Sequence, residues 1–168
     1  AVACLVLVMA QASRPSSQEF GSIMFPTSGA PAAQEAFLTG VKALHNFQFD
    51  EAAVAFQEAQ KTDPSFVMAY WGEAMSHNHP LWAQQDVDAA GKILARLDPT
   101  HEGRIAKAKL PKEKAFLVAM HELYFSAGDK LARDNAYSQA MARMHAQWPD
   151  DHEVAIFTSA SPFAGQLA

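Results

Sequence analysis

The chain has 168 residues, a formal net charge of −5 at pH 7 and a single cysteine. This length suits one domain, and an alanine-rich composition with few turn residues inside the periodic segments, and without strand signals, favours an all-α fold. Lysine and arginine are scattered, which argues against a nucleic-acid-binding protein, because phosphates require a continuous basic face.

The first residues read as the remnant of a secretory signal peptide. Residues 1–12, AVACLVLVMAQA, are apolar and end in a small-residue cleavage pattern, Ala10-Gln11-Ala12. This segment is too short to span a bilayer, so we expect a periplasmic or secreted bacterial protein without a membrane span after cleavage. Neither Met nor a basic region precedes it, so we interpret the chain as beginning inside the signal peptide. Cys4 as a lipoprotein cysteine is the alternative.

Residues 13–31 are expected to form an extended leader, because Pro, Gly and Ser are dense there. Ile23, Met24 and Phe25 interrupt this polar stretch. We expect this short apolar patch to pin the leader onto the first helices.

Helical periodicity predicts a pair of helices over residues 32–46 and 51–61, with Asp50 as the N-cap of the second. The next pair is expected from Phe66 to Met75 and over residues 86–97. Beyond it, the expected helices are 111–126 and 129–148. Residues 151–168 begin like another helix, but Ser, Pro and Gly follow, so either this helix is broken or a local sequence change has altered it.

Five residues in the first pair follow the pattern of a tetratricopeptide repeat (TPR): Gly40, Ala52, Phe56, Ala59 and Pro64. A repeat of about 34 residues needs a small residue where its helices cross, an aromatic plug and a terminating proline. Gly40 and Ala52 fit the crossing, Phe56 the plug and Pro64 the end. The second unit is degenerate, since Gly91 stands where Phe56 predicts an aromatic residue.

The segments ALHNFQFDEA, AYWGEAMSHNHPLW, FPTSG and GDKLARDNAYSQAM make the chain similar to a family of exported bacterial TPR proteins without an assigned activity. The resemblance implies a right-handed superhelix of about three irregular repeats over residues 32–168. It also implies further His-rich repeats beyond Ala168, so we interpret the helical domain as truncated at its C-terminus.

The repeat register places one set of side chains on the concave face of such a superhelix. These residues are His45, Met68, Trp71, Met75 and His79. Aromatic and methionine side chains bury much area at low entropic cost, which suits a bound helix or strand. We therefore expect a scaffold that binds a protein or peptide in this groove, while Trp82 and Tyr70 are expected to pack between helices.

Metal binding is the alternative from a different class. His45, His77 and His79 are its ligand candidates, but a closed site usually needs three or four ligands, so repeats absent from this chain would complete it. Hydrogen bonds from each histidine to its own helix end are the simpler interpretation. Met141, Met144 and His145 suggest copper, although methionines at helical spacing are typical of a core.

Catalytic motifs are not found, and we expect neither an enzyme nor a cofactor. His121-Glu122 does not continue to a zinc-hydrolase motif, because Phe125 stands at the position of the second histidine. There is no nucleophile elbow or phosphate-binding glycine loop. The densest basic stretch is expected to be a solvated helix face or, alternatively, a site for an anionic partner; it comprises Arg104, Lys107, Lys109, Lys112 and Lys114.

Overall fold

The computed structural model describes residues 23–160; the expected signal-peptide remnant at 1–12, residues 13–22 of the leader and residues 161–168 lie outside this range. The described chain is mostly helical, which confirms the all-α expectation. None of its helices is long and apolar enough to cross a membrane. The helices are α1 (Pro31–His45), α2 (Phe49–Thr62), α3 (Val67–Met75), α4 (Val87–Leu97), α5 (His101–Lys107), α6 (Pro111–Phe125), α7 (Lys130–Gln147) and α8 (His152–Ser159).

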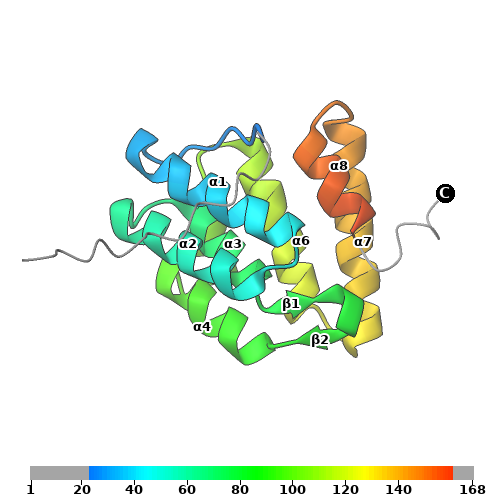
Figure 1. Cartoon of the computed structure of the whole chain (residues 1–168). Coiled ribbons are helices and arrows are strands. Elements are labelled where there is room, and N and C mark those ends of the chain that lie inside the picture. Colours follow the sequence, from blue (N-terminus) through cyan, green and yellow to red (C-terminus); the bar gives the residue numbers. More distant parts are fainter. Residues whose placement is uncertain (1–22, 161–168) are drawn as a thin grey trace, which may run out of the picture.

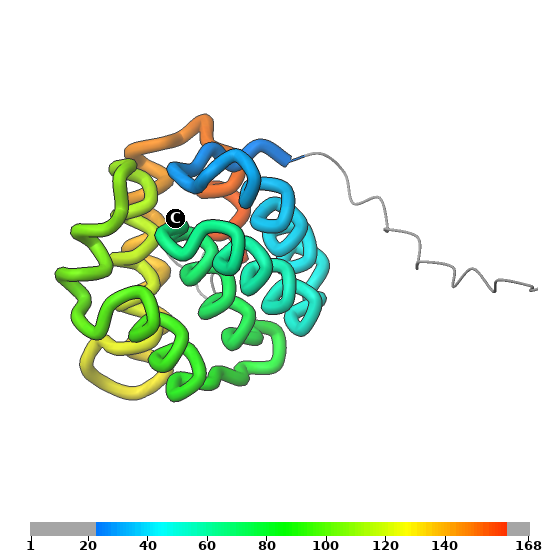
Figure 2. Tube along the Cα trace, turned by 90° about the vertical axis from the view of Figure 1, so that its left-hand side faces the viewer, coloured from blue at the N-terminus to red at the C-terminus, as the bar shows by residue number. Residues whose placement is uncertain are grey.

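Each helix packs chiefly on its neighbours in sequence, with α1 on α2, α2 on α3, α3 on α4, α6 on α7 and α7 on α8. Contacts of α3 with α6 join the two halves of the array. Figure 2 shows the helices following one another around a rounded body, so that the last helices return beside the first. At that junction, between α1 and α8, Nε2 of His45 lies 3.1 Å from Oε2 of Glu153.

Phe56 of α2 is the plug that the sequence predicts. Its side chain is fully buried. A Cβ atom on Gly40 of α1 would lie 2.7 Å from the Phe56 ring, and one on Gly72 of α3 would lie 2.3 Å from it. Three consecutive helices therefore approach closely because two of them carry glycine where the ring lies. Ala52, predicted at the same crossing, is also fully buried.

The boundaries of α1 to α4, α6 and α7 agree with the sequence to within two residues, but two local expectations are wrong. Asp50 is not the N-cap of α2, because Gln48 holds that position. Asp50 lies in the first turn, where its negative charge interacts favourably with the helix dipole and stabilises the helix. The short helix α5 was not expected, since seven residues hold too little periodicity. Thr100 caps it by accepting a hydrogen bond from the Gly103 amide at 3.0 Å.

A small hairpin separates α3 from α4, although the sequence shows no strand signal. Strand β1 (Asn78–His79) pairs antiparallel with β2 (Gln84–Gln85). The 3₁₀ turn η1 (Pro80–Trp82) joins them, and Ala83 closes it with a left-handed φ of 51°. Two-residue strands are too short for alternation to be read from sequence. Figure 1 shows the hairpin at the edge of the helical body, between α4 and α7.

The basic stretch does not form one solvated helix face. Arg104 on α5 is buried, and Lys107 lies 3.2 Å from the Asp98 carboxylate. Lys112 on α6 forms an ion pair with Asp151 at the start of α8. These side chains hold α5, α6 and α8 in place, while Lys109 and Lys114 are exposed.

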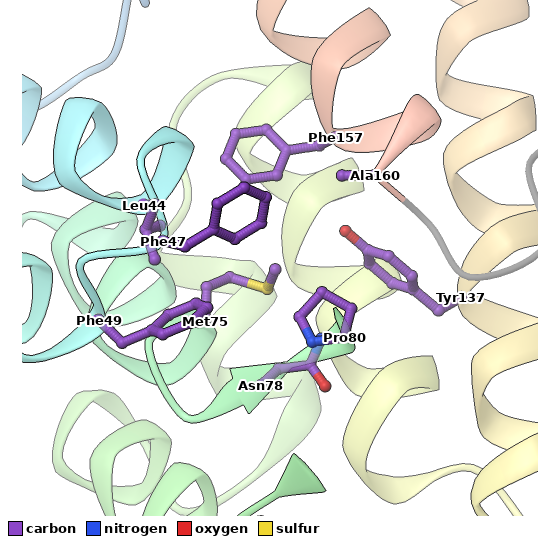
Figure 3. Close-up of a pocket in the computed structure, with 9 residues that line it drawn as sticks. All are labelled: Leu44, Phe47, Phe49, Met75, Asn78, Pro80, Tyr137, Phe157 and Ala160. Atoms are coloured by element: carbon purple, nitrogen blue, oxygen red, sulfur yellow. The ribbon is translucent and has the colours of Figure 1, made fainter. Parts of the chain in front are cut away.

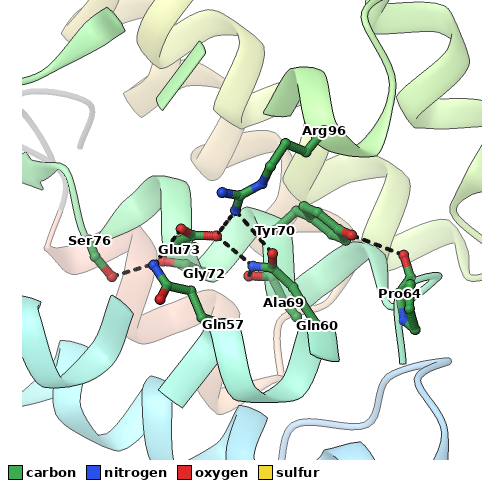
Figure 4. A network of polar contacts seen from close by, with 9 residues as sticks. All are labelled: Gln57, Gln60, Pro64, Ala69, Tyr70, Gly72, Glu73, Ser76 and Arg96. Atoms are coloured by element: carbon green, nitrogen blue, oxygen red, sulfur yellow. Dashed lines mark hydrogen bonds and ion pairs between the residues drawn. The ribbon is translucent and has the colours of Figure 1, made fainter. Parts of the chain in front are cut away.

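Glu73 on α3 is a buried carboxylate that joins three helices (Figure 4). Gln57 and Gln60 of α2 donate hydrogen bonds to its two oxygens at 2.9 and 2.6 Å. Arg96 of α4 donates to the same carboxylate and, at 3.1 Å, to the Gln60 side-chain oxygen. A buried charge with this many partners is structural, because each partner offsets part of its desolvation cost.

Candidate functional site

The predicted groove residues do not share one open surface. Met68 and Trp71 are 0% and 1% exposed, so the expectation that they line an accessible groove is wrong. The Trp71 ring centroid lies 6.1 Å from that of Phe25, 5.0 Å from that of Phe116 and 5.0 Å from that of Phe157. Side chains from the leader and from α8 therefore fill the face on which Trp71 lies.

The two predicted groove histidines have separate partners. Beyond its contact with Glu153, the His45 ring lies 5.5 Å from that of Phe157. His79 stacks on Phe49 with ring centroids 4.1 Å apart, and its Nε2 lies 3.1 Å from the Ser76 carbonyl oxygen. A carbonyl only accepts, so Nε2 of His79 donates in this contact. The interpretation that a histidine binds its own helix end is thus confirmed for His79, while His45 instead faces α8.

A metal site is not assembled in the part of the chain that the structure describes. No group of three or more His, Cys, Asp or Glu side chains lies close enough there to hold an ion. Met141 and Met144, the copper candidates, are buried in the core. His77 lies at the end of α3, partly buried. The alternative that additional repeats complete a site around His45, His77 and His79 stays a hypothesis.

An apolar cavity of about 60 Å³ opens where the ends of several helices meet the hairpin (Figure 3). Of the predicted groove residues, Met75 lines it. Burial raises the pKa of Tyr137, so its phenol is neutral and brings no charge to the cavity. Such a lining favours an apolar group over water. The lining residues are Leu44, Phe47, Phe49, Met75, Asn78, Pro80, Tyr137, Phe157 and Ala160.

Four rings form what we call the aromatic surface, which adjoins this cavity: Phe47, Phe49, His79 and Trp82. The Phe49 ring lies 6.3 Å from Phe47 and 6.2 Å from Trp82, in addition to its stack on His79. Phe47 and Trp82 are 47% and 57% exposed. The expectation that Trp82 packs between helices is therefore wrong. Rings so arranged offer flat apolar faces to a partner.

Phe47 occupies a backbone conformation that bulky residues rarely adopt. Its φ is 57°, at the position after the C-cap of α1. The Phe47 amide donates to the Leu44 carbonyl at 3.0 Å and the Gln48 amide to the Ala43 carbonyl at 2.9 Å, which is a Schellman motif. Glycine is usual at this position because a Cβ atom is strained there. Because Phe47 is half-exposed, its ring contributes little core packing to offset this strain.

Sequence reasoning named Met75 and His79 but missed Phe47, Phe49 and Trp82, because these three lie between the helices that the periodicity predicts. Phe47 is in the α1–α2 connection, Phe49 begins α2, and Trp82 is in the turn of the hairpin. The available signal was Trp82 itself, a large aromatic residue two positions after Pro80 in the connection between α3 and α4. Its proximity to Phe49 follows only from the packing of α2 against the hairpin.

Comparison with protein-family models, with curated proteins and with solved structures finds no match for this chain.

Proposed function

We propose that this chain is a helical-repeat scaffold that binds a protein or peptide partner through the aromatic surface and the adjoining cavity. The partner presents an apolar side chain to the cavity and packs its neighbouring residues on the exposed rings. A cavity of about 60 Å³ suits a small aliphatic group, since it is well below the roughly 150 Å³ that holds a benzene ring.

The observation that carries this proposal is the exposure of Phe47 and Trp82 beside an apolar cavity. Leaving large rings in water forgoes the free energy of their burial, and Phe47 adds backbone strain. Strained and exposed aromatic residues that gather at one place are typical of binding sites. Aromatic residues such as Trp and Phe are also enriched at protein–protein interfaces.

The helical pairs, with Phe56 between Gly40 and Gly72, support assignment to the exported TPR family that the sequence resembles. In this proposal the helices form a TPR-like right-handed superhelix. The apolar residues 1–12 support an extracytoplasmic location. We assign the chain a binding role and no catalytic one.

Selection of peptides from a random library on the full chain, followed by calorimetry, tests the binding role. Trp82→Ala is expected to weaken the selected peptides by about 2 kcal/mol, roughly thirtyfold in Kd, as for a buried aromatic anchor. Leu131→Ala is the matched control, because Leu131 on α7 is similarly exposed, at 56%, and lies outside the aromatic surface. Selected peptides that bind both variants as tightly as the original chain would contradict the proposal.

A further inference from the structure

The segment of residues 23–30, which we call the N-terminal strap, is bound to the helices as a peptide ligand is bound. It contains no helix or strand and runs directly into α1. Met24 is 85% exposed, whereas the next residue, Phe25, is 4% exposed. The strap therefore inserts one anchor side chain and leaves its neighbour in solvent.

Phe25 fills a recess formed by three helices. Its ring centroid lies 5.5 Å from that of Phe37 on α1 and 5.4 Å from that of Phe116 on α6, in addition to its contact with Trp71 on α3. Nζ of Lys112, which is on α6, lies 5.3 Å from the Phe25 ring centroid. An aromatic side chain surrounded by rings and approached by a cation is held by both packing and electrostatics.

Ser28 donates two hydrogen bonds to a buried carboxylate. Its amide donates to Oε1 of Glu113 at 2.6 Å, and its hydroxyl donates to Oε2 at 2.9 Å. Glu113 is 1% exposed, and its Oε2 also accepts the amides of Lys109 and Leu110 at the start of α6. The two strap bonds supply donors that the carboxylate would otherwise lack on that side.

Gly29 and Ala30 complete the contact. A Cβ atom on Gly29 would lie 2.5 Å from the Phe66 ring, so only glycine fits without a shift. The Ala30 amide donates to Oδ2 of Asp63 at 2.8 Å. One anchor ring, one serine and one glycine are thus each matched by a different feature of the helices.

The opposite side of the strap is open. Ile23, Met24 and Pro26 line one wall of a cleft of about 720 Å³. The turn before α8 and the first part of α8 form the other wall, with Asp150 and Ile156 among its residues. The strap therefore contacts the helices through its Phe25, Ser28, Gly29 and Ala30 side, while its other side borders this cleft.

We infer that the strap is an intramolecular peptide ligand, and that the site it fills recognises the pattern Phe-Pro-Thr-Ser-Gly as a separable peptide. The strap covers Trp71 and closes that face of the array to other ligands. This site is distinct from the aromatic surface, so it can be tested without the partner proposed above.

The test vacates the site in the full chain with Phe25→Ala/Ser28→Ala and adds a labelled, end-blocked peptide of residues 23–30. Fluorescence anisotropy is expected to show saturable binding to this variant and roughly tenfold weaker binding to the original chain, whose site is occupied. Peptides with Phe25→Ala or Ser28→Ala are expected to lose about tenfold in affinity. Adding Glu113→Gln to the variant weakens the binding of the unaltered peptide.

A variant with an unchanged far-UV spectrum that binds no peptide, or binds the Phe25→Ala peptide equally well, overturns the inference. If the variant does not fold, hydrogen exchange of the original chain decides. The amides of Ser28 and Ala30 are then expected to exchange by local opening, faster than those of Leu117 and Met120 in α6. Exchange of all four only through global unfolding would also overturn it.

Discussion

Phe47 combines a strained backbone conformation with a half-exposed ring. The Schellman motif that ends α1 requires a left-handed residue, and a phenylalanine is held there although glycine would be free of strain. The ring gains little burial, because 47% of the residue is exposed. Under the proposed function, the ring contributes instead to the aromatic surface to which it belongs.

Two substitutions separate the backbone strain at Phe47 from the loss of its ring. Phe47→Ala and Phe47→Gly remove the same aromatic contacts, but only glycine relaxes the left-handed backbone. The glycine variant is expected to be more stable than the alanine variant by about 1 kcal/mol in urea denaturation. Both variants are expected to weaken binding of the selected peptides. Equal stability of the two would show that the backbone at residue 47 is unstrained.

Gly72 and Gly91 give a second prediction at this scale, because replacing each of them with alanine is expected to change the stability of the fold in opposite directions. Gly72→Ala places a methyl group 2.3 Å from the Phe56 ring, within a packed crossing. It is expected to destabilise the fold by about 1 to 3 kcal/mol. Gly91→Ala on α4 meets Phe125 at an ordinary 3.7 Å.

Since alanine favours a helix interior, Gly91→Ala is expected to stabilise the fold by about 0.5 to 1 kcal/mol. Thermal unfolding of the two variants beside the original chain measures both effects. A Gly72→Ala variant as stable as the original would contradict the close crossing of α1, α2 and α3.

At the scale of elements, α8 depends on contacts with helices far away in sequence. Asp151 caps it by accepting the Val154 amide at 3.1 Å. Burial alone raises the pKa of Asp151, but hydrogen bonds from Lys112 and the Val154 amide, with the Lys112 charge, outweigh it and hold this pKa below its ordinary value. The ionised form of Asp151 is therefore favoured by folding.

A stability dependence on pH follows from this shift. The stabilisation is present above the unfolded pKa of about 3.9 and is lost as the pH falls through the lower folded pKa. Asp151→Asn keeps a capping oxygen and removes the charge. It is expected to cost about 1 kcal/mol at pH 7, with the difference from the original chain vanishing in strong acid.

Urea denaturation across this pH range measures the effect of Asp151→Asn. Asp150→Asn is the control, because the neighbouring Asp150 is exposed. An Asp151→Asn variant whose cost is the same at pH 7 and in strong acid would show that the ion pair with Lys112 contributes nothing.

The helices themselves were largely predictable, and the reason is local. Amphipathic periodicity and the start signals at Asp86, Asp129 and Asp151 define α4, α7 and α8, and each of these aspartates accepts a hydrogen bond from the first turn. The hairpin and α5 are too short to carry a period. The conformation of the hairpin depends on contacts with distant residues, such as the hydrogen bond from the Gln85 side chain to the Leu123 carbonyl at 3.2 Å.

At the scale of the whole molecule, the sequence indicates which face of a helix is apolar but not what covers it. Trp71 does face its neighbouring helices, yet Phe25 from the strap and Phe157 from α8 fill the space that a bound peptide was expected to take. The open apolar site lies instead where α1, α2 and the hairpin meet α7 and α8. That convergence is a property of the complete packing arrangement.

The central claim, that the aromatic surface and its cavity bind an apolar peptide segment, is tested most directly by mapping a selected peptide on the labelled full chain by nuclear magnetic resonance. We predict that the largest shift changes fall on the Trp82 indole, the Phe47 and Phe49 rings and the Met75 methyl group, which lines the cavity. Changes confined to α4 and α5, with Trp82 and Met75 unaffected, would contradict the claim.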